Sequence, residues 1–268
     1  MNKQKNEEIR SAVRENYGKV AAAGRPSCGC SSSSCCGTQN EFNPIEISLA
    51  LGYSQGDVMS IPEGANMGLG CGNPQAIAAL KSGETVLDLG SGGGFDCFLA
   101  RRVVGEKGLV IGVDMTPEMI TKSRNNAAKA DFRNVDFRLG ELENLPVADG
   151  IVDVIISNCV INLSPEKQRV FNEAFRVLKP GGRLAISDVV TTAELPDDMK
   201  NDMLFHTECI AGASSVKELE MMLLTAGFDS VQIKPKPESR ELIRNWLLGS
   251  KIEDYVVSAT IDAVKSKT

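Results

Sequence analysis

Histidine is almost absent from this 268-residue sequence, which contains a single copy, His206. This scarcity argues against a zinc site that combines cysteine and histidine at the usual spacing. It also leaves only one imidazole as a candidate general base. Basic residues are in the minority too, because 29 Lys and Arg face 35 Asp and Glu and give a net charge of −6. Without a concentrated basic run, nucleic acid and acidic membrane surfaces are poor candidate partners.

Long apolar segments are missing as well. The first residues, MNKQKNEEIRSAVREN, lack the apolar core of a signal peptide. No apolar run is long enough to cross a bilayer. We therefore expect a soluble, cytoplasmic protein.

Cysteine, in contrast, is well represented, with eight copies. In a reducing cytosol, this number of thiols favours metal, metalloid or redox chemistry over a disulfide framework. The length fits one large α/β domain with appendages, or two small domains. A hydrophobic content of 42% supports a sizeable core.

Strand and helix patterns alternate from residue 85 onward, which predicts an α/β fold with parallel strands and helices on both faces. A helix over 7–23 precedes this region. After it we expect helices near 197–208, 214–226 and 238–248. Together the strands give a mostly parallel sheet of seven, expected at 85–90, 108–115, 135–140, 152–158, 183–190, 230–235 and 255–264.

A glycine-rich loop follows the first predicted strand, in VLDLGSGGGFD. Glycines there let the backbone approach a ligand, and the next helix start adds partial positive charge. The loop fails as a dinucleotide fingerprint, because Phe95 stands where G-x-G-x-x-G, counted from Gly90, needs its third glycine. Asp88 before the glycines and Asp114 at the end of the second strand suit S-adenosylmethionine, which has an amino acid end, a ribose and no phosphate. Each acid taken alone is equally well explained as a cap of a turn or helix.

The series DLGSGGG, GVDM, GELENLP, VIISN and LKPGGRLAISD resembles the class I methyltransferases over roughly residues 84–190. The resemblance implies a Rossmann-like fold with S-adenosylmethionine as methyl donor. In that fold the end of the fourth strand lies beside the reactive methyl group, and Leu142 and Glu143 flank the adenine. The cofactor-binding residues then expected are Asp88, Gly90, Gly92, Asp114, Met115, Leu142, Glu143 and Asn158.

A thiol at the end of the fourth strand has a chemical use. Methyl transfer to oxygen or nitrogen often needs a base, whereas a nucleophile with a free lone pair does not. Trivalent arsenic is such a nucleophile, and soft thiolates are its preferred ligands. Three thiolates would replace its oxygens and leave a lone pair that attacks the sulfonium methyl in line. Positioning would then supply most of the rate.

Three cysteines are candidates, because the carboxyl edge of the sheet can gather all of them. Cys159 ends the fourth strand, Cys209 follows the fifth by a helix, and Cys71 precedes the first among glycines. For each one alone, the alternative is a small buried hydrophobic residue. We assign Cys97 to that class, since DCFLA places it on a helix that packs on the sheet.

The segments NMGLGCGNP, SNCVINLSPEKQ, LPDDM, ECIAGA and VVSATIDAVK together resemble the arsenite S-adenosylmethyltransferases, from about residue 50 to the end. This resemblance implies trivalent arsenic held by Cys71, Cys159 and Cys209, and successive methylations. It also implies thioredoxin or a small thiol such as glutathione as reductant. We divide the chain into an N-terminal helix with a mobile loop, an S-adenosylmethionine-binding domain, and arsenic-site helices with a segment that completes the sheet, at 1–43, 44–192 and 193–268.

A fourth functional cysteine of that family lies nearer the N-terminus, where this chain has Cys28, Cys30, Cys35 and Cys36 in a Ser-rich loop. The alternative is a solvated segment without a function. The vicinal pair and the C-x-C pair are suited to capture arsenic or to exchange disulfides. Four cysteines within nine residues leave little chain for a closed zinc or iron–sulfur site.

Two other functions stay open at this point. A class I methyltransferase acting on a small organic carbon or thiol substrate would share the cofactor motifs, but it gives no role to Cys71 and Cys209. A non-enzymatic metalloid-binding or redox protein would use the cysteine loop, but it gives no role to Asp88, Gly92 and Asp114.

Overall fold

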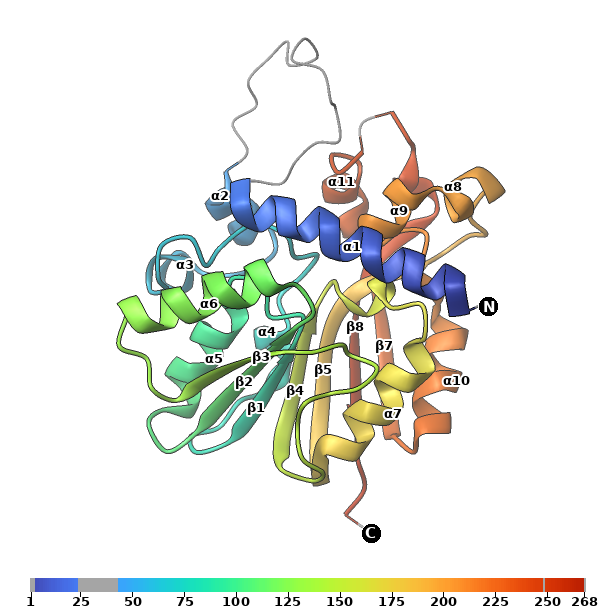
Figure 1. Ribbon diagram of the computed structural model, residues 1–268. Helices are drawn as coiled ribbons and strands as arrows, with labels where there is room; N and C mark the ends of the chain where they lie inside the picture. Colours follow the sequence, from blue (N-terminus) through green and yellow to red (C-terminus); the bar gives the residue numbers. More distant parts are fainter. Residues whose placement is uncertain (1–2, 24–42, 248, 268) are drawn as a thin grey trace.

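The computed structural model describes residues 3–23, 43–247 and 249–267, so the predicted cysteine loop lies outside the described residues. Within these ranges the strands form one sheet in the order β3-β2-β1-β4-β5-β8-β7, and the short β6 pairs with β5 (Figure 1). The strands β1 to β5 pair in parallel, whereas β8 runs antiparallel to both β5 and β7. The predicted, mostly parallel seven-stranded sheet is confirmed, with β6 as an additional short strand. The bounds are β1 Thr85–Leu89, β2 Leu109–Asp114, β3 Val135–Leu139, β4 Val152–Asn158, β5 Leu178–Thr191, β6 Ser214–Ser215, β7 Asp229–Lys236 and β8 Val256–Val264.

Helices cover both faces of the sheet, which explains why the inner strands are continuous apolar runs. In β4, the residues from Val154 to Ser157 are fully buried. One face packs against α4 (Gln75–Ala78), α5 (Phe95–Val104) and α6 (Pro117–Lys129). The other face packs against α7 (Lys167–Val177) and α10 (Val216–Ala226).

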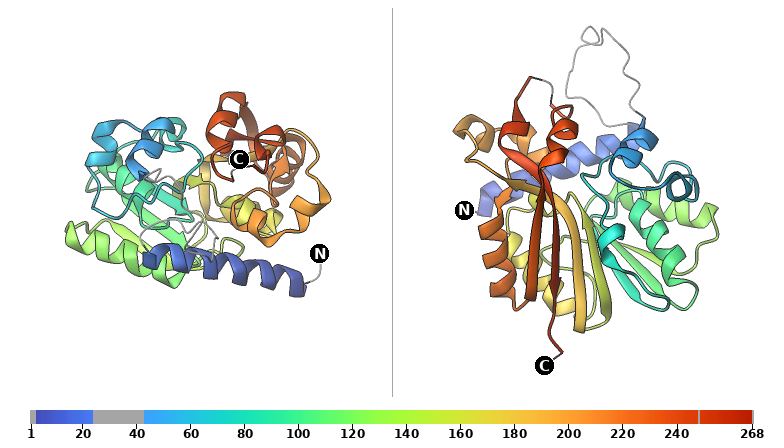
Figure 2. Two further views of the ribbon diagram at one scale, coloured as in Figure 1. Left: turned by 90° about the horizontal axis from the view of Figure 1, so that it is seen from above. Right: turned by 180° about the vertical axis from the view of Figure 1, so that it is seen from behind.

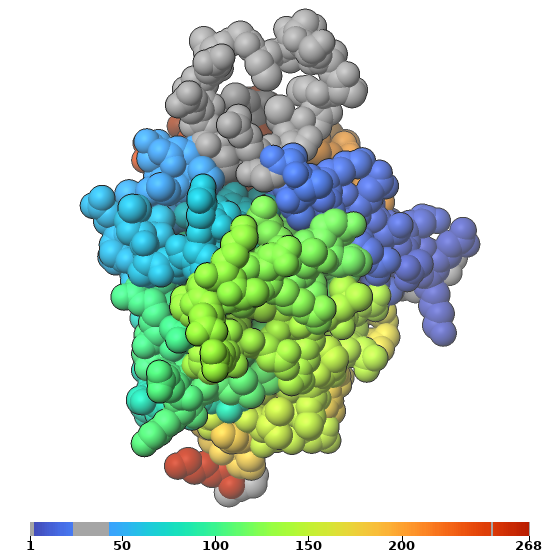
Figure 3. Space-filling view, turned by 60° about the vertical axis from the view of Figure 1, so that its left-hand side comes forward, coloured from blue at the N-terminus to red at the C-terminus, as the bar shows by residue number. Residues whose placement is uncertain are grey.

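The helix α1 (Lys3–Ala23) crosses the carboxyl edge of the parallel strands, as the front view and the view from above show (Figures 1 and 2). Its Ile9 and Val13 are buried in the same apolar cluster as the three candidate cysteines. The space-filling view shows α1 directly above α6 (Figure 3). In open α/β sheets this edge is where ligands bind, so α1 covers the expected site.

The fifth strand begins earlier than predicted. It starts at Leu178, whereas the strand was expected from residue 183, so it also includes the KPGG segment. The pairing with β4 shifts register between Val152 and Val154, whose partners are Leu178 and Arg183. This irregularity absorbs the extra residues, so proline and glycine are tolerated within the strand.

The predicted helix over 197–208 is two short helices, α8 (Asp197–Asn201) and α9 (Met203–Thr207). They separate because Asp202 has an extended backbone and its carboxylate accepts a hydrogen bond from the N–H of Leu204, which caps a new helix. The helix predicted over 238–248 is shorter in the structure: within the described part of this range, the α-helix is α11 (Arg240–Ile243). None of the helices in the described ranges combines the length and the apolar character needed to cross a membrane.

Candidate active site

A cleft lies at the carboxyl edge of the sheet, beneath α1. Its walls come from the glycine loop after β1 and from the segments that follow β2 and β4. From α1, the side chains of Arg10, Val13 and Tyr17 line it. Every predicted cofactor residue also lines this cleft: Asp88, Gly90, Gly92, Asp114, Met115, Leu142, Glu143 and Asn158.

Asp114 connects the two loops that form the cleft. Its carboxylate accepts hydrogen bonds from the N–H of Gly92 at 2.9 Å and from the N–H of Thr116 at 2.8 Å. Burial raises the pKa of this carboxyl group, although these two hydrogen bonds oppose the shift. Gly90 has a φ of +72°, and a Cβ there would lie 2.5 Å from the side chain of Val160, so this turn requires glycine.

The glycine loop offers room and polar groups to a ligand. A Cβ added to Gly92 would meet nothing within 4 Å, so the backbone faces open space there. The hydroxyl of Ser91 is buried and has no hydrogen-bond partner among the described residues. An unpaired hydroxyl in the same cleft as the carboxylates of Asp88 and Asp114 fits a ligand with an ammonium group and ribose hydroxyls, as in S-adenosylmethionine.

A buried polar cluster at the start of α5 was not predicted. The Tyr53 hydroxyl donates to Asp96 at 2.9 Å, and the Asn158 amide lies 3.3 Å from the same carboxylate. Burial raises the pKa of Asp96 to about 6, against hydrogen bonds that lower it. Burial and the nearby Asp96 raise the pKa of Asp88 well above its ordinary value. The position of Asp96 directly after the glycine loop was a usable signal, whereas nothing around Tyr53 resembled a motif.

Arg10 attaches α1 to the opposite side of the cleft. Its guanidinium lies 3.2 Å from the carboxylate of Glu143, and it also pairs with Glu166. The Ser164 hydroxyl donates to the same Glu143 oxygen. Glu143 is therefore held by two donors at the place where adenine was predicted, and Arg10 is a site residue that sequence reasoning missed.

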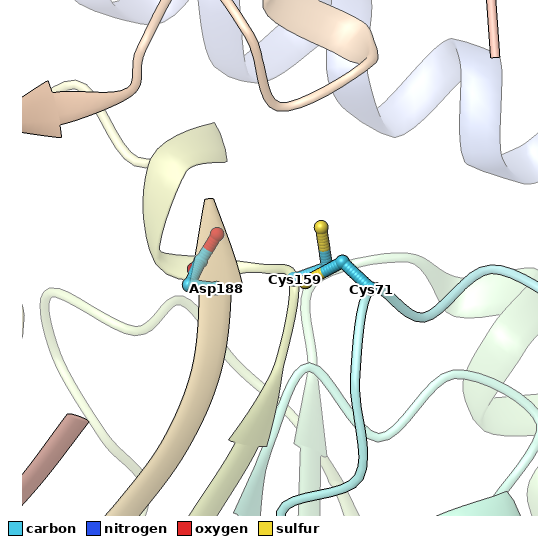
Figure 4. A group of neighbouring side chains, drawn as sticks. All are labelled: Cys71, Cys159 and Asp188. Carbon is cyan, nitrogen blue, oxygen red and sulfur yellow. The ribbon is translucent and has the colours of Figure 1, made fainter. Parts of the chain in front are cut away.

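The structure brings the three predicted arsenic ligands together. Cys71, Cys159 and Cys209 are 2%, 7% and 3% exposed and belong to one cluster. The Cys209 thiol donates to the carbonyl of Cys159 at 2.9 Å. The sulfurs of Cys71 and Cys159 and a carboxylate oxygen of Asp188 all lie within 4.8 Å of one another (Figure 4). Of the three cysteines, Cys159 reaches the cofactor cleft itself.

Two of these cysteines have an unusual backbone. The φ angles of Cys159 and Cys209 are 58° and 63°, in the left-handed region that side chains other than glycine rarely adopt. Such a conformation costs about 1–3 kcal/mol per residue and occurs mostly at functional sites. The strain at both positions supports a functional role for this thiol pair over simple packing.

Comparison with known proteins identifies the family of this chain. A family model described as a methyltransferase domain matches residues 80–227. An arsenite methyltransferase from Halobacterium salinarum is 56% identical over 265 residues, covering 97% of this chain and 67% of that protein. Another, from Aquipseudomonas alcaligenes, is 41% identical over 201 residues, covering 72% of this chain and 57% of that protein. The chain belongs to the arsenite methyltransferase family.

A solved structure extends the similarity to three dimensions. It is the arsenic(III) S-adenosylmethionine methyltransferase from Chlamydomonas reinhardtii, with a TM-score of 0.61 and 32% sequence identity. The match covers 84% of this chain and 74% of that one. The predicted resemblance and class I methyltransferase fold are confirmed, and the non-enzymatic alternative is wrong. The chain spans just over half of the Aquipseudomonas arsenite methyltransferase and about two thirds of the Halobacterium one.

The thiols of Cys71, Cys159 and Cys209 all have a raised pKa, which favours their protonated form. Burial raises the pKa of Cys71. The hydrogen bond with Cys159, followed by burial, raises the pKa of Cys209 well above its ordinary value. Each thiol therefore carries a proton at neutral pH, and this proton can leave with an oxygen that the sulfur replaces.

Asp188 lies beside the thiols and was also missed. Its carboxylate accepts hydrogen bonds from the N–H groups of Ile161 and Val189 and from the side chain of Asn162. It thereby fixes η1 (Ile161–Leu163), the turn that follows Cys159. Because Asp188 lies inside β5, a strand pattern gave no reason to single it out.

Cys97 and the single histidine lie outside the cluster of Cys71, Cys159 and Cys209. Cys97 is fully buried on α5, as predicted, and its thiol donates to Asp88 at 3.2 Å. His206 lies on α9 and is absent from the residues that line the cleft. Burial lowers the pKa of its imidazole. The predicted N-terminal thiols lie outside the described residues.

Proposed function

We propose that this chain transfers methyl groups from S-adenosylmethionine to trivalent arsenic, first arsenite and then methylarsenite, held by the thiolates of Cys71, Cys159 and Cys209. The observation that carries the proposal is the meeting of three buried thiols at the end of the cofactor cleft, with Cys159 in both. The names of the arsenite methyltransferase relatives support the same substrate.

Arsenic capture balances without an added base. Each thiol forms one As–S bond while one As–O bond breaks, and the thiol proton leaves with the hydroxyl group as water. Arsenite can react with all three cysteines in this way, and one water is released for each As–S bond that forms. The product is a pyramidal centre with its lone pair free, so a histidine base is not needed. This fits a site whose thiols keep their protons until arsenic replaces them.

The chain's own residues prepare the methyl donor. When bound, S-adenosylmethionine supplies an electrophilic methyl group on a sulfonium sulfur. Asp114 and Glu143 would accept hydrogen bonds from its ribose and adenine, and Asp88 would hold its ammonium group; all three residues line the cleft. Val13 and Tyr17 of α1 line the same cleft. Their apolar surfaces would exclude water from it, which would strengthen these interactions.

Turnover requires electrons as well as methyl groups. Forming the As–C bond with the lone pair oxidises arsenic from the trivalent to the pentavalent state. Two electrons must therefore return, and a dithiol supplies them when it becomes a disulfide. Thioredoxin or glutathione is the proposed source, with Cys28, Cys30, Cys35 or Cys36 as capture or exchange thiols. A cytoplasmic location would supply these reduced thiols.

One assay tests this function. The full chain is incubated with methyl-labelled S-adenosylmethionine, arsenite and a small thiol, and the arsenic species are separated over time. We expect labelled methylarsenic species, and none without arsenite. Label that appears only on an organic acceptor would instead support the alternative of a small carbon or thiol substrate. Arsenite binding without any label transfer would contradict both.

A further inference from the structure

Asn158 is the last residue of β4 and lines the cofactor cleft next to Cys159. Its side-chain amide forms hydrogen bonds with other groups of the protein. Its Oδ1 accepts a hydrogen bond from the N–H of Cys71 at 3.0 Å. Its Nδ2 lies 2.9 Å from the carbonyl of Gly72, 3.1 Å from the Tyr53 hydroxyl and 3.3 Å from the Asp96 carboxylate. Both ends of the amide therefore hold neighbouring chain segments together.

The loop that carries Cys71 lies directly on the ends of two strands. A Cβ on Gly70 would lie 2.6 Å from the Asn158 amide nitrogen, and one on Gly72 would lie 2.8 Å from Ser187 on β5. Neither distance is tolerated by a real side chain, so both positions require glycine for close approach. The placement of the Cys71 thiol thus depends on the Asn158 amide, on these two contacts and on the carbonyl of Ser187, to which the thiol itself donates at 3.6 Å.

The other two thiols are held by groups other than the Asn158 side chain. The N–H of Cys159 donates to the carbonyl of Ser187 at 2.8 Å, and the thiol of Cys209 donates to the carbonyl of Cys159. Asp188 fixes the turn after Cys159 through the N–H of Ile161 at 2.9 Å. None of these contacts involves the Asn158 side chain, so its loss should displace one thiol of the three.

The two arsenic substrates differ in the number of thiols that they can use. Arsenite has three exchangeable oxygens, whereas methylarsenite has two. We propose that Asn158 is a positioning residue that presents Cys71 as the third arsenic ligand, and that it thereby supports methylation of arsenite more than methylation of methylarsenite. This inference rests on the proposed function. It differs from the cofactor-binding role predicted for Asn158, which would affect both substrates alike.

The variant Asn158→Ala tests the inference through single-turnover rates on both substrates. Because a misplacement of about 1 Å can cost about 100-fold in rate, we expect a loss of that order for arsenite. The methylarsenite rate and the affinity for S-adenosylmethionine, measured by calorimetry, should change little. The double variant with Cys71→Ser should be no slower on arsenite than Cys71→Ser alone, since one change acts through the other.

Two further variants separate positioning from general damage. Asn134→Ala also removes a side chain with three hydrogen bonds, to Arg101, Gly105 and Gly108, away from the cleft. It should reduce neither rate selectively. Gly70→Ala keeps Asn158 but pushes the Cys71 loop away, so it should reproduce the loss on arsenite. If Asn158→Ala does not fold, Gly70→Ala tests whether the position of Cys71 controls the rate on arsenite.

The outcomes that overturn the inference are distinct from those that overturn the proposed function. Equal losses on both substrates, weaker S-adenosylmethionine binding, or losses that multiply in the double variant would assign Asn158 to the cofactor instead. The three-thiol function itself fails if Cys71→Ser methylates arsenite at the normal rate. The inference alone fails if Cys71→Ser loses activity on arsenite but not on methylarsenite, while Asn158→Ala and Gly70→Ala show no such selective loss.

Discussion

Asp114 joins the glycine loop to the turn after β2, because its carboxylate accepts hydrogen bonds from a backbone N–H group of each segment. In Asp114→Ala we expect weaker binding of S-adenosylmethionine with nearly intact arsenite binding. The loss of a charge-assisted hydrogen bond should cost about 1.5–3 kcal/mol of binding free energy. Calorimetric titration measures this, with Asp136→Ala on β3, in an ion pair with Arg138, as a control. Unchanged donor affinity would remove Asp114 from the cofactor site.

Substitution by serine should affect Cys159 and Cys209 differently from Cys97. Cys159→Ser and Cys209→Ser should each abolish methylation of arsenite and methylarsenite, because serine is a harder and far less acidic ligand. In Cys97→Ser the hydroxyl keeps a donor toward Asp88, so activity should remain. Arsenic speciation gives the rates, and circular dichroism checks the fold. Normal arsenite methylation by Cys159→Ser would disprove the thiolate mechanism.

Single residues at strand ends could be predicted from the sequence, and their partners could not. Asp88, Asp114 and Cys159 were found because parallel strands deliver their carboxyl ends to one edge. Arg10 reaches Glu143 across 133 positions of sequence, and Tyr53 reaches Asp96 across 43. Contacts of this range depend on how loops and helices pack, which neither periodicity nor a local motif encodes.

Among the helices, α1 has the largest influence on the cleft, since it covers the carboxyl edge of the sheet. Its apolar spacing predicted a helix, and the structure extends it from the expected 7–23 to Lys3–Ala23. The partner of its buried face could not be predicted, because an amphipathic pattern indicates that a face is buried without indicating which element covers it. The strands were easier to predict than the partner of this helix, because the β-branched runs of β1, β2 and β4 are bounded by glycines and acids.

The ion pair of Arg10 with Glu143 should hold α1 in place. Both side chains are largely buried, at 11% and 6% exposed. Replacing Arg10 by Met keeps the aliphatic stem but leaves a buried carboxylate unpaired, which should cost about 3 kcal/mol of unfolding free energy. Lys19→Met, in the exposed pair with Glu15, should change the unfolding free energy little, because solvent screens such a pair. Denaturant titration compares the two, and equal effects would show that Arg10 does not anchor α1.

At the scale of the whole molecule, the site places several acids where burial disfavours their charge. Asp88, Asp96, Asp114 and Asp188 all have a raised pKa, chiefly because of burial. A fold organised for stability alone would not gather them at one sheet edge. We interpret this cost as the consequence of building a polar cofactor site and a thiol site at the same place.

The acids should make stability depend on pH. For Asp96 the folded pKa of about 6 lies above the ordinary 3.8. The folded state therefore binds more protons between these values, and stability falls as the pH rises through about 6. Between pH 5 and 7 the wild type should lose about 1 kcal/mol more unfolding free energy than Asp96→Asn, which lacks this titration. Denaturant unfolding at both pH values measures the difference, and equal losses would contradict it.

The number of arsenic–sulfur bonds tests the central claim most directly, and native mass spectrometry can count it. Each As–S bond that forms releases one water, so the mass of the adduct gives the number of thiols used. In a chain with Cys28, Cys30, Cys35 and Cys36 replaced by serine, arsenite should bind with loss of three waters and methylarsenite with loss of two. The further change Cys71→Ser should reduce the arsenite count to two and leave the methylarsenite count unchanged. An arsenite adduct that still loses three waters without Cys71, or that never loses more than two, would contradict the three-thiol site.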